Sequence, residues 1–337
     1  MITNLEVLWQ VWFAILAFIL LLYATLDGFD LGVGIISLFA ENEESRGLMM
    51  GSLGTIWDAN ETWLVLFGGI LFGAFPLIYG LVLSALYIPL VLMLVGLIFR
   101  AVSFEFRPHS ENPAIWSRAF GLGSLVAALT QGFALGGVMS GISIQVEYHH
   151  GGLFNWITPL SIAVALGVVC LYVLLGSTYL VAKSVGKTQK TAYAAAYTIA
   201  PISLFLTLAG FLWSGVRYEF IRPRWFGFPQ MIFTVGGMIV AAVCMGMVIV
   251  SLAKGRQRAP FFWVLGFAAS SFLALGASFY PNLIPPAITA GDAAAQPMTM
   301  QVMLVVIAFF LPVLLAYNIY QFWVFRGKVT SNVYDEQ

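Results

Sequence analysis

Long apolar runs separated by short polar connections dominate the pattern of this chain, and several runs extend for 18 residues or more with almost no charge. About 20 consecutive apolar residues are enough for a helix to cross a bilayer. The alternating polar and apolar pattern of a membrane barrel does not appear. The pattern therefore predicts an all-α integral membrane protein. Residues 1–337 would form a single polytopic domain of nine transmembrane helices, at about 8–38, 50–76, 80–104, 120–142, 156–181, 193–213, 228–252, 261–279 and 300–325.

Most connections between these spans are short. The shortest, residues 75–80, separates the second span from the third, so these two are expected to form a tight helical hairpin. Longer connections are expected at 105–119, 143–155 and 280–299, and the last contains four prolines and is expected to be an ordered external loop. No strong internal repeat is visible, but we expect two four-helix bundles and one peripheral helix.

Basic residues are distributed unequally over the predicted connections. The connections after odd-numbered spans, with the end of the third span, hold 12 of the 15 Lys and Arg, and the opposite side holds 3. Because basic residues favour the cytoplasmic side, the N-terminus is expected outside and the C-terminus in the cytoplasm, which agrees with an odd number of spans.

Composition supports the same class of protein. The chain is 61% hydrophobic and only 9% charged, whereas a soluble domain carries about a quarter charged residues. The formal net charge is zero, so nothing indicates a nucleic-acid partner. Glu6, and no Lys or Arg, precedes the first apolar run, which is therefore expected to be a mature span and not a cleaved signal peptide. Cys170 and Cys244 lie in apolar runs, which argues against a disulfide framework.

Two acidic patches interrupt the first two spans, at residues 25–32 and 55–63. Inserting a charged Asp at the bilayer centre costs at least ~2.5–3.5 kcal/mol, so acidic residues within a span are expected to have a functional or structural role. Asp27 and Asp30 are three residues apart and share a helix face, as do Asp58 and Glu61. With the predicted orientation, one set of charged residues converges on the cytoplasmic leaflet: Asp27, Asp30, Asp58, Glu61, Glu105, Arg100 and Arg107.

We interpret these acids as a hydrated proton path from the cytoplasm, with Asp58 deepest and Asp27 or Glu105 as neighbouring stations. Asp30 and Glu61 would belong to the same path. The residues expected to support it are Arg100, Trp57, Asn60 and Trp63. The alternative is structural pairing, in which Arg100 or Arg107 neutralises Asp58 or Asp30 and fixes helix packing.

No histidine lies within a predicted span, which argues against haem ligation inside this chain. His109, His149 and His150 all fall in connections. His149 and His150 next to Glu147 are a candidate metal site, but a solvated loop pair is favoured because no further ligand has useful spacing. We therefore expect neither a catalytic residue nor a metal site in the chain. Near the start, Trp9, Trp12 and Phe13 could line a quinone groove, although lipid anchoring is the stronger interpretation.

Three segments strongly resemble subunit II of the cytochrome bd family of quinol oxidases: Thr25–Gly34, Trp57–Trp63 and Phe99–Arg107. They occur in the family's order and spacing and cover the first third of the chain, while the rest matches in length and span pattern. The family typically has Gly where this chain has Ala59. The short chain is similar to the cyanide-insensitive-oxidase branch.

This resemblance implies an accessory subunit in the bacterial inner membrane that takes part in aerobic electron transport. Its partner, subunit I, would hold three haems (two of b type and one of d or b type), oxidise quinol and reduce oxygen to water. It also implies a proton channel at the subunit interface involving Asp58 and Asp27, with precedents for a bound quinone and small single-span subunits.

The alternative function is a proton-coupled secondary transporter. Such a protein should show repeated broken helices at mid-membrane and work without a haem partner. Acids gathered on one leaflet favour a half-channel that ends at a reaction centre in a neighbouring subunit.

Overall fold

The structure is a computed structural model that describes residues 4–54, 56–141 and 154–329. The candidate metal site at His149, His150 and Glu147 lies outside these residues. The described part is almost entirely helical. Its elements are α1 (Leu5–Ser37), α2 (Glu43–Gly51), α3 (Trp57–Ala74), α4 (Pro76–Ala85), α5 (Tyr87–Phe106), α6 (Pro113–Met139), α7 (Pro159–Lys183), α8 (Gly186–Arg217), α9 (Arg222–Phe226), α10 (Gln230–Ala253), α11 (Ala259–Phe279), β1 (Asn282–Ile284), β2 (Ile288–Thr289) and α12 (Pro297–Val324).

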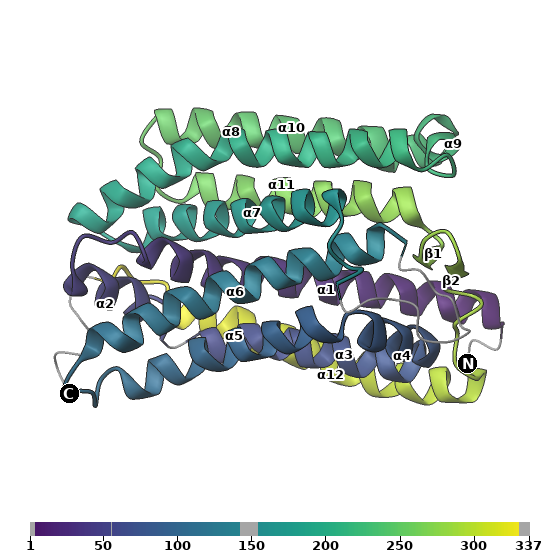
Figure 1. The fold of residues 1–337 in the computed structure, drawn as a ribbon, viewed down its shortest axis with the longest axis horizontal. Helices are drawn as coiled ribbons and strands as arrows, with labels where there is room; N and C mark the ends of the chain where they lie inside the picture. Colours follow the sequence, from purple (N-terminus) through teal and green to yellow (C-terminus); the bar gives the residue numbers. More distant parts are fainter. Residues whose placement is uncertain (1–3, 55, 142–153, 330–337) are drawn as a thin grey trace.

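The long helices lie side by side in layers (Figure 1). In one group, α7 packs on α8, α8 on α10, α10 on α11, and α11 returns to α7. In the other, α1 packs on α3 and α6, while α5 packs on α6. Contacts of α7 with α1 and α6 join the two groups, and α12 contacts α3 and α1 from outside. The short helix α2 lies at one end of the array, and α9 and the β1–β2 hairpin lie at the other (Figure 1).

Among the residues that the structure describes, eight helices are long and apolar enough to cross a membrane, and they correspond to every predicted span except the second. The second span corresponds in position to α3, which has 18 residues and includes Asp58 and Glu61. At 1.5 Å per residue it is roughly 27 Å long. The count of nine spans and their orientation therefore remain predictions.

The chain around the second span differs from its predicted outline. Residues 50–76 do not form one helix, since α2 ends at Gly51 and α3 begins at Trp57. The turn predicted at 75–80 is also wrong: α4 begins at Pro76, and Phe75 alone joins it to α3. Proline is favoured in the first turn of a helix because its missing N–H needs no partner there. A second break at Leu86 separates α4 from α5.

Two other boundaries also moved. Helix α6 begins at Pro113, so part of the connection predicted at 105–119 is helical. Helix α8 extends from Gly186 to Arg217, well beyond the predicted 193–213. The predicted span was too short because a hydropathy pattern detects only the apolar part of a helix, and both ends of α8 contain polar residues.

Glycines bring α1 and α7 into backbone contact. A Cβ on Gly32 would lie 1.8 Å from the carbonyl oxygen of Tyr172, and one on Gly176 would lie 2.4 Å from the amide nitrogen of Val33. All residues of α1 from Asp27 to Ser37 are buried as a result. This close approach positions the acidic half of α1 in the centre of the molecule.

The aromatic residues near the start of α1 pack within the protein. Trp12 is fully buried, and its indole N–H donates to the Met300 carbonyl oxygen over 3.2 Å. Trp9 and Phe13 contact Tyr280, with ring centroids 6.2 and 5.3 Å apart, respectively. Trp12 thus belongs to the core, and its side chain is not available for the lipid anchoring that the sequence favoured.

Candidate functional site

Arg100 lies at the centre of the candidate site and is completely buried. Its Nη1 forms an ion pair with Asp27 Oδ1 of α1, and its Nη2 lies 3.1 Å from Glu61 Oε2 of α3. One guanidinium from α5 therefore holds carboxylates from two other helices. The planar fork of donors in arginine suits this double contact. Separating the members of such a buried pair is costly because it leaves an uncompensated charge. This cost holds α1, α3 and α5 in their packed arrangement.

A second polar contact lies beside the first. Asn60 Nδ2 donates to Asp30 Oδ2 over 2.9 Å, and both side chains are completely buried. Their spacing explains the arrangement: Asp27 and Asp30 lie on one face of α1, while Asn60 and Glu61 are adjacent on α3. We refer to Asp27, Asp30, Asn60, Glu61 and Arg100 as the carboxylate cluster.

The carboxylate cluster has more negative than positive groups. If Asp27, Asp30 and Glu61 were all ionised, three negative charges would face one guanidinium. Several buried polar atoms of the cluster have no hydrogen-bond partner among the described residues: Asp27 Oδ2, Asp30 Oδ1, Asn60 Oδ1 and Arg100 Nε. Closely spaced carboxylates in a low-dielectric site share protons and titrate as a group. This arrangement can therefore hold an exchangeable proton.

Asp58 and Glu105 are not part of the carboxylate cluster. Both side chains are exposed on the surface of the chain. Asn60 faces α1, and successive residues of a helix are about 100° apart, so Asp58 points to the other side of α3. Asp58 is thus not the most enclosed carboxylate, and the seven charged residues expected together do not all converge. The buried carboxylates of the set are Asp27 and Asp30.

The tryptophans of the second acidic patch have packing roles. Trp63 is buried and its indole N–H donates to Asn318 Oδ1 of α12 over 3.2 Å. Trp57 stacks on Phe104 of α5, with ring planes 3° apart and centroids 5.3 Å apart. These contacts attach α3 to its neighbours on either side of the carboxylate cluster.

Arg107 lies in a separate polar group at the end of α5. Its Nε donates to Ser117 Oγ over 3.0 Å, and Ser117 Oγ donates to Glu43 Oε2 over 2.8 Å. Arg46 also pairs with Glu43. Burial acts to raise the pKa of Glu43, but hydrogen bonds from Ser117 and Arg46 and the two nearby positive charges outweigh it, so that this pKa is lowered. Arg107 forms an ion pair with Glu43, whose Oε2 lies 4.0 Å from Arg107 Nη2.

A third polar group was not anticipated from the sequence. Tyr172 Oη donates to Gln131 Oε1 over 2.7 Å, and Gln131 Nε2 donates to Tyr23 Oη over 2.6 Å. The signals available were a lone amide in the apolar part of α6 and the spacing of Tyr23 four residues before Asp27. Neither signal identifies the three-helix contact, because the residues are far apart in the chain.

Candidate metal ligands are sparse in the described part of the chain. No group of three His, Cys, Asp or Glu side chains there is arranged to hold a metal ion. His109 is exposed beyond the end of α5, and its Nδ1 lies 3.1 Å from the Glu105 carbonyl oxygen.

Comparison with known proteins places this geometry in a family. The family described as cytochrome bd terminal oxidase subunit II matches residues 8–325. The chain belongs to this family. Its relatives include subunit 2 of the cytochrome bd-I ubiquinol oxidase of Escherichia coli K12, 27% identical over 97% of each chain. Subunit 2 of the cytochrome bd ubiquinol oxidase of Bacillus subtilis is 26% identical over 95% of this chain and 96% of the relative.

The fold agrees with the family. The bd oxidase from Geobacillus thermodenitrificans contains a chain that superposes with a TM-score of 0.76 at 20% identity, covering 94% of this chain and 98% of that one. The chain is thus a multi-pass protein of the bacterial inner membrane, as predicted. Membership also favours the oxidase function over a secondary transporter. The branch within the family stays a prediction.

Proposed function

We propose that this chain is the accessory subunit of a quinol:oxygen oxidoreductase, where it supports a haem-bearing subunit I and forms part of a cytoplasmic proton path. The observation that carries the proton role is the buried excess of carboxyl groups around Arg100. The curated relatives are named as subunits of ubiquinol oxidases, which supports quinol as the electron donor. The three haems, two of b type and one of d or b type, would lie in subunit I.

The outer face of α3 is the proposed contact with subunit I. Exposed residues follow one another at spacings of three or four along this face: Asp58, Thr62, Val65, Gly69 and Phe72. A carboxylate that faced lipid at bilayer depth would cost at least ~2.5–3.5 kcal/mol, so protein or water should cover Asp58. A Cβ on Gly68 or Gly69 would meet nothing within 4 Å, which leaves room for another helix to approach closely.

In this arrangement Asp58 receives protons at the subunit interface and the carboxylate cluster lies behind it. Asp27, Asp30 and Glu61 would share the next proton, with Arg100 and Asn60 holding their side chains in place. Glu105 is exposed in the last turn of α5 and would act as an outer station. Trp57 and Trp63 keep α3 in register with its neighbours.

The membrane arrangement is also part of the proposal. We infer nine spans with α3 as the second, an external N-terminus and a cytoplasmic C-terminus, supported by the unequal distribution of Lys and Arg. The ring of contacts among α7, α8, α10 and α11 supports a four-helix bundle, and the outside position of α12 supports a peripheral helix. A bound quinone and small single-span subunits remain predictions.

Asp58→Asn tests the proton role. The complex carrying this variant should assemble with its full haem absorbance, because the side chain is exposed and replaced by one of the same size. Quinol-dependent oxygen uptake should fall by about tenfold or more, as expected when a proton-transfer group is lost. Glu44→Gln is the matched control, since Glu44 is an exposed carboxylate on α2, and it should retain wild-type uptake.

Two outcomes would contradict the proposal. Wild-type oxygen uptake by a fully assembled Asp58→Asn complex would remove Asp58 from the path. A native preparation without haem absorbance or quinol-dependent oxygen uptake would refute the oxidase function itself.

A further inference from the structure

The hydrogen-bonded series Tyr172, Gln131 and Tyr23 connects three helices beside the carboxylate cluster. Tyr172 lies on α7, Gln131 on α6 and Tyr23 on α1. Only 4% of Tyr172 and 3% of Tyr23 is exposed, so water has little access to either hydroxyl. Two buried phenols joined by one amide have a defined hydrogen-bond direction, because each hydroxyl has a single proton.

That direction leaves the Tyr23 proton unused by the series. Tyr23 Oη accepts a hydrogen bond from Gln131 Nε2, so its own proton remains available for another acceptor. Tyr23 precedes Asp27 by four residues, which places both on one face of α1. The two groups are close enough to interact electrostatically. Asp27 Oδ2 is buried with no hydrogen-bond partner among the described residues, and an ionised carboxylate can only accept.

Tyr172 favours one orientation of the Gln131 amide. The oxygen and nitrogen of a glutamine amide are assigned from its hydrogen-bond network. With the amide reversed, Gln131 Oε1 would take the Tyr23 proton, and the phenol would turn a lone pair toward the Asp27 carboxylate. Donation from Tyr172 Oη to Gln131 Oε1 favours the opposite orientation and leaves the Tyr23 proton for Asp27.

Gly28 allows Tyr172 to reach this position. A Cβ at residue 28 would lie 2.7 Å from Tyr172 Cε1 and 2.8 Å from Cδ1, which is too close for the ring to stay where it is. The glycine that follows Asp27 in the sequence therefore makes room for the ring that orients the partner of Asp27. One short segment of α1 supplies the acid and the space for its supporting group.

We propose that Tyr23 is a positioning residue that donates a hydrogen bond to Asp27, and that Gln131 and Tyr172 hold Tyr23 in the donating orientation. Asp27 also faces Arg100 from α5, Glu61 from α3 and Asp30 on its own helix. Arg100 holds Asp27 Oδ1, and Tyr23 fixes the remaining freedom of the carboxylate. This role rests on the proposed function, because the orientation of Asp27 affects turnover only if Asp27 handles protons.

A donor to the ionised carboxylate favours the ionised form over the protonated form. Replacing Tyr23 by Phe removes this donor and leaves the neighbouring Arg100, Glu61 and Asp30 unchanged. The pH profile of turnover should therefore move to higher pH by about one unit, which is a tenfold change in proton concentration.

The test compares Tyr23→Phe and Tyr172→Phe with wild type in the complete oxidase complex purified from membranes. Two quantities are measured against pH: quinol-dependent oxygen uptake and the infrared carbonyl-stretch band of protonated carboxyl groups. Both should move to higher pH in Tyr23→Phe by about one unit, and in the same direction but by less in Tyr172→Phe. Gly28→Ala should act like Tyr172→Phe, because it displaces the Tyr172 ring without removing a hydroxyl.

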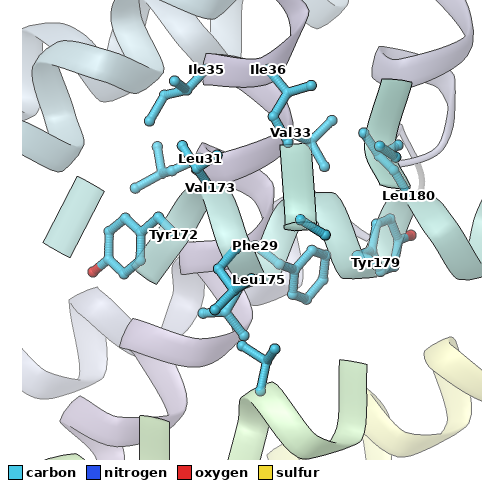
Figure 2. Close-up of a cluster of buried hydrophobic side chains, with 14 of the residues drawn as sticks. Phe29, Leu31, Val33, Ile35, Ile36, Tyr172, Val173, Leu175, Tyr179 and Leu180 are labelled. Atoms are coloured by element: carbon cyan, nitrogen blue, oxygen red, sulfur yellow. The ribbon is translucent and has the colours of Figure 1, made fainter. Parts of the chain in front are cut away.

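Tyr179→Phe is the matched control. Tyr179 is seven residues further along α7, is equally buried, and donates to the Ser52 carbonyl oxygen over 2.8 Å. Figure 2 shows the hydroxyl groups of Tyr172 and Tyr179 pointing in opposite directions. Because Tyr179 lies near Asp30 and its hydroxyl donates to Ser52, loss of this hydroxyl should lower stability and displace the carboxyl band and the pH profile of oxygen uptake by much less than Tyr23→Phe does.

Unchanged pH profiles in an active Tyr23→Phe complex would overturn the positioning role, as would an equal displacement in Tyr179→Phe. If Tyr23→Phe fails to assemble, Gln131→Met tests the positioning role instead. It frees the Tyr23 hydroxyl to rotate but leaves the phenol in place, and an unchanged pH profile in this variant would overturn the role. Absence of haem and oxygen uptake in the wild-type complex would instead refute the proposed function, so the two failures are distinguishable.

Discussion

Replacing Arg100 by Met tests whether the carboxylate cluster depends on one buried charge. Arg100 and Asp27 have no exposed side-chain surface, whereas a quarter of the Glu61 side chain is exposed. Removing the guanidinium leaves Asp27 charged and unpaired, and breaking a buried pair in this way costs about 3–5 kcal/mol. Because 1.36 kcal/mol is tenfold, the unfolded population should rise by a factor of roughly 10² to 10⁴.

The assay is unfolding of the purified complex in mixed micelles with increasing denaturing detergent, followed by the haem absorbance and by helical content. The double variant Arg100→Met with Asp27→Asn should be more stable than Arg100→Met alone, because no unpaired charge remains on Asp27. The expected coupling between the two sites is about 1–3 kcal/mol. Glu61 needs no compensating change, since water can reach it.

Arg118→Met is the control, because Arg118 is exposed on α6. It should alter stability by no more than about 0.5 kcal/mol. The explanation would fail if Arg100→Met were as stable as Arg118→Met. It would also fail if the losses in the double variant were simply additive, since the ion pair would then contribute nothing beyond its separate members.

Two further predictions concern packing and acid sensitivity. Gly32→Ala should prevent stable assembly, because the new Cβ would lie 1.8 Å from the Tyr172 carbonyl oxygen. Gly210→Ala is the control: its Cβ would meet nothing within 4 Å, so it should be neutral or stabilising by up to about 1 kcal/mol. The yield of the complex and its thermal midpoint measure both effects. The lowered pKa of Glu43 means that its stabilisation is present above its ordinary pKa and is lost as pH falls through the lowered value. Glu43→Gln should therefore weaken the acid dependence of the thermal midpoint measured from about pH 6 to about pH 3. An unchanged acid dependence would exclude Glu43 as its source.

The acidic patches show which features of the site the sequence could predict. Spacing predicted that Asp27 and Asp30 share a helix face, and both indeed point into the protein. The same rule paired Asp58 with Glu61, yet Glu61 reaches Arg100 while Asp58 stays exposed. Helical spacing fixes the relative direction of two side chains but not the direction of the whole face. That depends on how α3 is rotated against α1 and α5.

The sequence also could not predict the ion-pair partners of Arg100 and Arg107. Both Arg100 and Arg107 were candidates to neutralise Asp58 or Asp30. Instead Arg100 pairs with Asp27 and Glu61, and Arg107 joins Glu43 and Ser117. Partners on different helices are separated by tens of residues in the chain, so only the packing of α5 against its neighbours selects them.

The sequence by itself determined the membrane class, most of the spans and the family, because apolar length and three local motifs are properties of contiguous residues. The tertiary structure decided which acids are buried together, where α3 and α4 are divided, and that Tyr23, Gln131 and Tyr172 lie beside Asp27. The physical reason is that hydropathy reports the preference of one segment for lipid. A buried charge must be matched by donors from other segments, and their positions exist only once the helices have packed.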